Sequence, residues 1–165
     1  MATTAFKGTT VNTVGDLPAV GAQAPAVSLT AADLSEITSE QLSGKRVVLN
    51  IFPSIDTAVC ATSVRKFNEL AASLANTTVV CASMDLPFAL NRFCGAEGIE
   101  NVQVGSAFRD DFGTAYGVQM IDGPMRGLLA RSVVVLDTDG KVLHTQLVPE
   151  ITTEPDYDAA VAALS

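Results

Sequence analysis

The chain has 165 residues, of which 48% are hydrophobic and 17% are charged, and its formal net charge at pH 7 is −8. This length and balance predict one globular domain over residues 1–165 with a substantial core, and they exclude a disordered chain. The acidic charge gives no basic footprint for nucleic acid or an anionic membrane surface, and no apolar run is long enough to cross a bilayer.

The first predicted elements are two short strands around a glycine within residues 4–14, which form a small N-terminal β-hairpin. Residues 15–26 hold two glycines and two prolines and are expected to form a connecting loop. A short strand is expected at residues 27–30, and residues 39–44 predict one helical turn that ends at a glycine. Residues 1–16 are therefore a hairpin extension on the main domain.

A buried strand-helix-strand unit is predicted next. The nearly unbroken apolar run at residues 46–52 ends at Pro53 and indicates a strand that is buried on both faces. Residues 59–75 carry apolar side chains at helical spacing, and residues 77–83 form the next buried strand. Residues 87–95 predict a helix that begins at a proline and ends at a glycine.

The last third of the chain predicts a partly helical segment at residues 107–116, followed by an antiparallel hairpin. Its strands, residues 130–137 and 141–147, flank an Asp-Gly turn, and a final helix runs over residues 155–163. A parallel βαβ unit that leads into an antiparallel hairpin is the thioredoxin arrangement. We therefore predict an α/β, thioredoxin-like fold with a central mixed sheet flanked by helices.

The chain has three cysteines, Cys60, Cys81 and Cys94, and one histidine, His144. There is no Cys-x-x-Cys pair, and the spacing does not suit a structural zinc site. The N-terminus lacks the basic stretch and apolar run of a secretory signal, so we expect the cytoplasm, where permanent disulfides are rare. Cys81 lies inside an apolar strand and is expected to be a packing residue, whereas Cys60 and Cys94 are redox candidates.

Cys60 is the candidate nucleophile because it lies where a strand gives way to a helix. Unpaired backbone N–H groups and the positive end of the dipole gather at a helix N-terminus and favour a thiolate. Thr57 lies three residues earlier, so its hydroxyl is expected to reach the sulfur, and Pro53 shields the site from water. For the cation that such a site needs we choose Arg131, which begins a strand expected beside Pro53, over Arg65 on the helix.

The segments around Cys60 and Cys94 resemble those of a known protein family. The segment FPSIDTAVC at residues 52–60 resembles the peroxidatic loop of peroxiredoxins. The blocks DLPFA at residues 85–89 and RFCG at residues 92–95 are similar to those of the thiol peroxidase subfamily, the atypical two-cysteine type. Ala58 stands where that subfamily usually has proline, which we expect to loosen the loop and leave the chemistry intact. Further similar blocks lie at the N-terminal hairpin and at residues 123–125, 128–131 and 147–151, so the likeness spans the chain.

The resemblance implies a thiol-specific peroxidase that reduces hydrogen peroxide and organic (alkyl) hydroperoxides. Cys60 would become a sulfenic acid, Cys94 of the same chain would form a disulfide with it, and thioredoxin would reduce that disulfide. The Thr57 hydroxyl would accept a hydrogen bond from the bound peroxide. The resemblance further implies no metal, haem or flavin cofactor, reducing equivalents from thioredoxin, and a homodimer packed near the active sites.

Two other functions stay open. A dithiol-disulfide oxidoreductase on the same fold requires a Cys-x-x-Cys pair at the helix start, where this chain has Thr57. A non-enzymatic binding protein leaves Thr57 and the second redox cysteine unexplained. Because Cys60 and Cys94 lie on successive helices and a disulfide requires Cα atoms within about 7 Å, we expect both segments to unwind when the bond forms. Gly95 and Gly98 would ease that movement.

Overall fold

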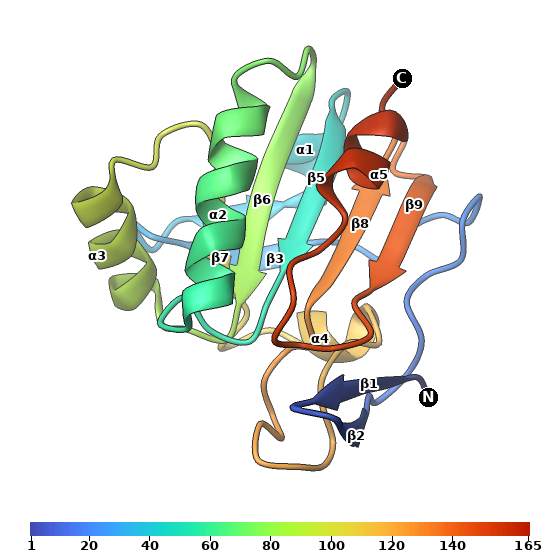
Figure 1. The fold of residues 1–165 in the computed structure, drawn as a ribbon. Helices are drawn as coiled ribbons and strands as arrows, with labels where there is room; N and C mark the ends of the chain where they lie inside the picture. The colour runs from blue at the N-terminus through green and yellow to red at the C-terminus, as the bar shows by residue number, and fades with distance from the viewer.

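The computed structural model describes residues 1–165 and has two sheets. A seven-stranded mixed sheet with the order β4-β3-β7-β6-β5-β8-β9 forms the centre, and a two-stranded hairpin lies beyond one of its ends (Figure 1). The strands are β1 (Thr3–Phe6), β2 (Thr9–Asn12), β3 (Ser28–Ala31), β4 (Glu36–Thr38), β5 (Arg46–Ile51), β6 (Thr77–Ser83), β7 (Gln103–Ser106), β8 (Ser132–Leu136) and β9 (Val142–Leu147). The helices are α1 (Ser39–Leu42), α2 (Ala58–Ala71), α3 (Pro87–Glu97), α4 (Phe112–Ala115) and α5 (Tyr157–Ala162).

Strand β5 lies between β6 and β8 in the sheet, and its end positions the candidate site. β6 runs parallel to β5 and β8 runs antiparallel to it, with Ile51 opposite Ser132. The carboxyl end of β5 therefore lies beside the beginning of β8 and beside the carboxyl end of β6. The residues that follow β5 and β6, and those that precede β8, meet at this edge.

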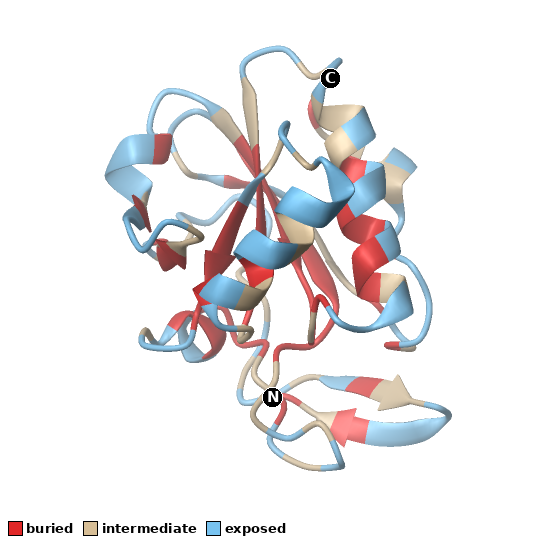
Figure 2. Ribbon diagram, turned by 90° about the vertical axis from the view of Figure 1, so that its left-hand side faces the viewer, coloured by how far each residue is buried: buried red, intermediate tan, exposed pale blue.

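Successive side chains of β5 point to opposite faces of the sheet and pack into two hydrophobic cores. Val47, Leu49 and Ile51 pack on the face that α1 and α4 cover, whereas Val48 and Phe52 pack under α2, α3 and α5. Figure 2 shows the burial concentrated along the central strands and on the inner sides of the helices. The prediction of a strand buried on both faces is thus confirmed.

The N-terminal hairpin docks on the segment that follows β9. The Glu150 carboxylate accepts hydrogen bonds from the Lys7 and Gly8 amides, and the Thr4 hydroxyl donates to the Val148 carbonyl at 2.7 Å. The Ile151 amide donates to the Ala5 carbonyl at 2.8 Å. The predicted hairpin is confirmed, and its docking fixes a segment whose carbonyl also contacts the candidate site.

The predicted mixed sheet with flanking helices is confirmed, but several bounds differ: the helix predicted at residues 59–75 ends at Ala71, and the one predicted at residues 155–163 spans Tyr157–Ala162. The short strands β4 and β7, which were not predicted, extend the sheet beyond β6. The third helix was predicted to end at Gly95, but the structure ends α3 at Gly98, whose φ of 66° is the left-handed conformation that closes a helix. Gly95 lies within the helix.

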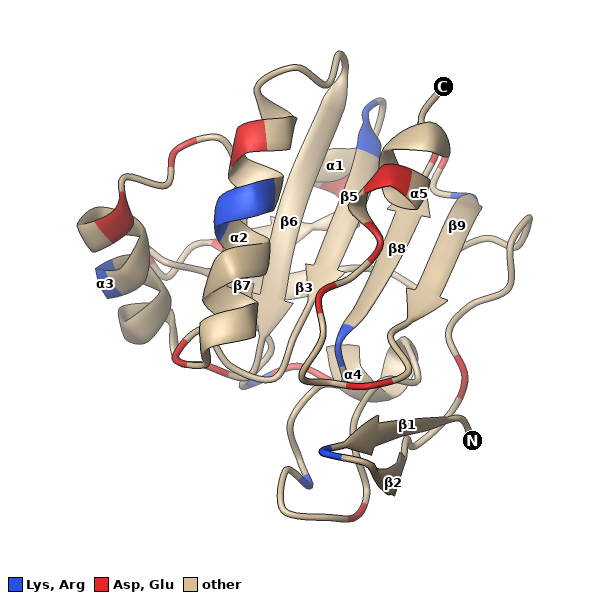
Figure 3. Ribbon diagram, viewed as in Figure 1, with Lys and Arg blue, Asp and Glu red and all other residues tan.

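Charged side chains are spread over the surface. Figure 3 shows the basic residues on separate elements and not gathered on one face. None of the helices is both long enough and apolar enough to cross a membrane.

Candidate active site

Cys60 lies in the first turn of α2 and is completely buried. Thr57 caps this helix in an extended conformation without a side-chain hydrogen bond to the helix amides. The turn is tied to the sheet: the Ser63 hydroxyl donates to the Cys60 carbonyl at 2.8 Å, and the Asn50 amide of β5 donates to the Ser63 hydroxyl at 3.2 Å. The sulfur is thus held away from water in the first turn of α2, where the backbone N–H groups lack intrahelical acceptors.

Arg131 immediately precedes β8 and lies against Cys60. Its Nη2 lies 3.3 Å from the Cys60 Sγ, and its Nε donates to the Ile151 carbonyl at 2.8 Å. The side chain is only 2% exposed, and its Nη1 is buried without a hydrogen-bond partner. Arg65, the alternative cation, instead forms an ion pair with Glu97 of α3. The site therefore contains one guanidinium with an unused donor next to the sulfur.

Thr57 and Pro53 lie on the loop between β5 and α2. Pro53 is buried directly after β5, and Thr57 is exposed at the helix start. The Thr57 hydroxyl donates to the Ser54 carbonyl at 3.0 Å, so its proton points at the loop and not at the sulfur. With its proton engaged there, the hydroxyl oxygen has only lone pairs to offer to another group.

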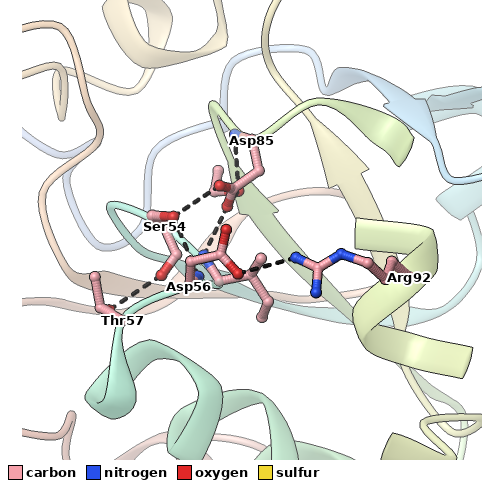
Figure 4. A network of polar contacts seen from close by, with 7 residues as sticks. Ser54, Asp56, Thr57, Asp85 and Arg92 are labelled. Atoms are coloured by element: carbon pink, nitrogen blue, oxygen red, sulfur yellow. Dashed lines mark hydrogen bonds and ion pairs between the residues drawn. The ribbon is translucent and has the colours of Figure 1, made fainter. Parts of the chain in front are cut away.

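A residue that the sequence analysis missed holds this loop. Asp85 follows β6, and its carboxylate accepts hydrogen bonds from the Ser54 hydroxyl and the Ile55 amide, both at 2.7 Å (Figure 4). On the other side of the loop, the exposed Asp56 forms an ion pair with Arg92 of α3 at 3.2 Å. A signal was present, since an acidic residue at the carboxyl end of a buried parallel strand lies at the usual edge for a functional site.

The other two cysteines differ in accessibility. Cys94 is half-buried on α3 and lines a cavity of about 490 Å³, and burial raises the pKa of its thiol. Cys81 is fully buried in β6, and burial raises the pKa of its thiol to about 12. All three cysteines are free thiols, and α2 and α3 are both intact. Of the three cysteines, Cys94 is therefore the one whose side chain is partly exposed.

The family follows from comparison with known proteins. A family model described as Redoxin matches residues 19–161. The chain belongs to the Redoxin family. A redoxin from Mycobacterium tuberculosis (strain ATCC 25618 / H37Rv), named Thiol peroxidase, is 62% identical over 164 residues, which cover 99% of each chain. Another protein named Thiol peroxidase, from Corynebacterium glutamicum, is 60% identical over 165 residues and covers 100% of each chain.

Solved structures agree with this assignment. A peroxiredoxin-like protein from Aquifex aeolicus superposes with a TM-score of 0.94 at 42% identity, over 99% of this redoxin and 96% of that chain. A thiol peroxidase from Chromobacterium violaceum gives a TM-score of 0.90 over 98% and 94% of the two chains, and at 20% identity it shows the fold alone. The predictions of a thioredoxin-like fold and of the thiol peroxidase subfamily are confirmed, and this redoxin is a peroxiredoxin-type peroxidase.

No group of three or more His, Cys, Asp or Glu side chains lies together in a way that could hold a metal ion.

Proposed function

We propose that this peroxidase reduces hydrogen peroxide and alkyl hydroperoxides at Cys60, with Cys94 as the resolving cysteine and thioredoxin as the reductant. The observation that carries the proposal is the position of Arg131. One of its N–H groups points at the Cys60 Sγ from 3.3 Å, and the neighbouring Nη1 is buried and unpaired. A buried donor without a partner is costly, and a peroxide oxygen beside the sulfur would satisfy it.

In the first step the Cys60 thiolate attacks one peroxide oxygen. The S–O bond forms as the O–O bond breaks, and the bonding pair leaves with the second oxygen, which takes a proton and departs as water or an alcohol. Arg131 stabilises the negative charge that spreads from sulfur to the leaving oxygen. The Thr57 oxygen, whose own proton is held by the Ser54 carbonyl, accepts a hydrogen bond from the peroxide O–H. Pro53, which is buried on the same loop, shields the sulfur from water in this proposal.

In the second step the Cys94 sulfur attacks the Cys60 sulfenic acid, forms a disulfide and releases water. The two cysteines occupy separate intact helices, and Cys60 is fully buried, so the first turn of α2 and the C-terminal half of α3 unwind to join them. Unwinding also frees the Cys94 thiol from the burial that raises its pKa, which favours the attacking thiolate.

Thioredoxin then reduces the disulfide by thiol exchange, so the cycle uses no metal, haem or flavin. Three free thiols suit a reducing compartment, such as the cytoplasm.

We also propose that the protein acts as a homodimer that packs near the active sites. Leu86 and Phe88 follow Asp85 directly and are 52% and 66% exposed, and Phe108 is exposed just after β7. Because β6 and β7 are parallel, these apolar side chains leave the same edge of the sheet that holds the Cys60 loop. Analytical ultracentrifugation should give twice the chain mass, and Phe88→Asp should shift it toward the monomer.

The cycle is tested by mixing the reduced protein with a small excess of hydrogen peroxide and titrating the free thiols. We expect the loss of two thiols within seconds, no fast loss in Cys60→Ser, and a single sulfenic acid that is trapped by dimedone in Cys94→Ser. Cys81→Ala is the matched control and should lose two thiols like the parent. A Cys60→Ser protein that consumes peroxide as fast as the parent would refute the proposal.

A further inference from the structure

We propose that Asp85 is a positioning residue of the peroxidase reaction. Its carboxylate fixes the Ser54–Ile55 turn, and that turn sets the Thr57 hydroxyl that receives the peroxide. The inference rests on the proposed role of Cys60 and Thr57, and it adds a residue outside the loop on which the geometry of that loop depends. Asp85 does not touch the sulfur, so it acts through the backbone of its neighbours.

The Asp85 carboxylate uses both oxygens and is itself held in place. Oδ1 accepts from the Ser54 hydroxyl at 2.7 Å, and Oδ2 accepts from the Ile55 amide at 2.7 Å and from the Ser83 hydroxyl at 2.6 Å. The Ser83 hydroxyl in turn accepts from the Asp85 amide at 3.2 Å. Ser83 is the last residue of β6, so the carboxylate is anchored on the central sheet and holds the loop against it.

Ser54 connects the anchored turn to Thr57 through its carbonyl. The Ser54 carbonyl accepts both the Thr57 amide at 3.1 Å and the Thr57 hydroxyl at 3.0 Å, and the Ser54 hydroxyl accepts from the Asp56 amide at 3.2 Å. Figure 4 shows Asp85, Ser54 and Thr57 following one another across the turn. Moving Ser54 therefore moves the acceptor that orients the Thr57 hydroxyl.

Removing the carboxylate leaves this turn without its anchor. The Ile55 residue is buried at 2% exposure, so its amide would lose its partner in a place that water does not readily reach. Cys60 is secured separately through Ser63 and Asn50, which do not contact Asp85. The loss should therefore affect the alignment of the peroxide more than the reactivity of the sulfur.

The test separates these two properties by measuring two rates at Cys60 in a Cys81→Ala, Cys94→Ser background. Asp85→Ala should slow the reaction with hydrogen peroxide about 10- to 100-fold, the size of effect that a small misplacement of reacting groups produces. Alkylation of Cys60 by iodoacetamide, which needs the thiolate and no aligned peroxide, should change by less than about threefold.

Asp85→Asn is the conservative rescue. An asparagine oxygen in the place of Oδ2 accepts from the Ile55 amide and the Ser83 hydroxyl, and its NH₂ group donates to the Ser54 hydroxyl, which accepts as well as donates. This variant should react with peroxide within about threefold of the parent, since it keeps the positioning and removes only the charge. Asp33→Ala is the matched control, because Asp33 also accepts from a serine hydroxyl and a backbone amide but in the distant β3–β4 turn.

The outcomes distinguish a failure of the proposed function from a failure of the proposed role of Asp85. A parent protein without a fast Cys60 reaction would overturn the proposed function. A fast parent with an equally fast Asp85→Ala variant would overturn only the role of Asp85, as would equal losses of the peroxide and iodoacetamide rates. An Asp85→Asn variant as slow as Asp85→Ala would assign the effect to charge and also overturn positioning. If Asp85→Ala does not fold, Ser54→Ala, which cuts the same path, should show the same selective loss.

Discussion

Replacing Arg131 by lysine tests the central feature of the site, a single guanidinium whose three nitrogens point in three different directions. Its Nε holds the Ile151 carbonyl, its Nη2 reaches the Cys60 Sγ, and its buried Nη1 has no partner. A lysine keeps the positive charge but carries it on a single nitrogen, which cannot point along three fixed directions from a planar group. Arg131→Lys therefore removes the geometry and leaves the charge.

The size of the effect follows from the donor that is lost. Losing one preorganised donor to a transition-state oxygen costs about 2.7 to 4 kcal/mol. At about 1.4 kcal/mol for each factor of ten, the peroxide reaction should slow by about 100- to 1000-fold. The lysine can still contact the sulfur, so alkylation of Cys60 by iodoacetamide should fall much less than the peroxide reaction.

The assay follows the first step alone, in a Cys94→Ser background that cannot form the disulfide. The chain has no tryptophan, so rapid quenching with dimedone and intact-mass measurement of the trapped sulfenic acid replaces fluorescence. Arg65→Lys is the matched control, because Arg65 lies on α2, the helix that carries Cys60, but pairs with Glu97. Two results would refute the reasoning: an Arg131→Lys rate within threefold of the parent, or an equal loss in Arg65→Lys.

Three further predictions concern pH and movement. Burial raises the pKa of the Cys81 thiol from 9.0 to about 12, so the neutral thiol stabilises the fold fully below pH 9, and this contribution is lost as the pH rises toward 12. In urea unfolding, the free energy of unfolding of the parent relative to Cys81→Ala should fall by about 1.4 kcal/mol for each pH unit above 9. Hydrogen bonds from the Thr152 and Gly8 amides lower the pKa of Glu150 from 4.5 to about 2, so the hairpin should stay docked above pH 4.5 and loosen as the pH falls through about 2. The NMR chemical shifts of the hairpin amides should change near pH 2 in the parent and stay constant in Glu150→Gln. The exposed Arg92–Asp56 pair is worth about 0.2 to 1 kcal/mol, so Arg92→Ala should speed disulfide formation by about 1.4- to fivefold, and 0.5 M NaCl should bring the parent to the same rate. An unchanged rate in Arg92→Ala would show that the pair does not resist unwinding.

Local patterns predicted the elements that build the site because each pattern has a single cause. The β5 strand has apolar residues at both alternating positions and only Arg46 at its start and Asn50 as polar exceptions, so it was expected to be buried on both faces. Strand β7 was missed because it is only four residues long and includes Gly105. That glycine lies where a Cβ would come within 2.9 Å of the Leu29 Cβ on β3. Its presence reflects close packing across the sheet, which no local propensity records.

The contacts at the site that were not predicted also depend on the three-dimensional structure and not on local sequence. Helical spacing placed the Thr57 hydroxyl near the sulfur but did not reveal that it donates to the Ser54 carbonyl, because that contact forms within the loop before the helix. Asp85 lies 30 residues from the Ile55 amide that it holds, so its partner emerges only when β5 and β6 lie side by side. Contacts made between neighbouring strand ends depend on the register of the sheet, which the sequence analysis did not specify.

The unpaired donor of Arg131 is retained because hydrogen bonds fix other parts of the same side chain. A buried N–H without a partner costs about 1 to 3 kcal/mol, and an unconstrained guanidinium would turn to remove that cost. Arg131 cannot turn, because Ile151 holds its Nε and the docked hairpin holds Ile151. The N-terminal hairpin would therefore contribute to the proposed chemistry without supplying a reacting group, because its contact with Ile151 helps to hold the Arg131 guanidinium beside Cys60.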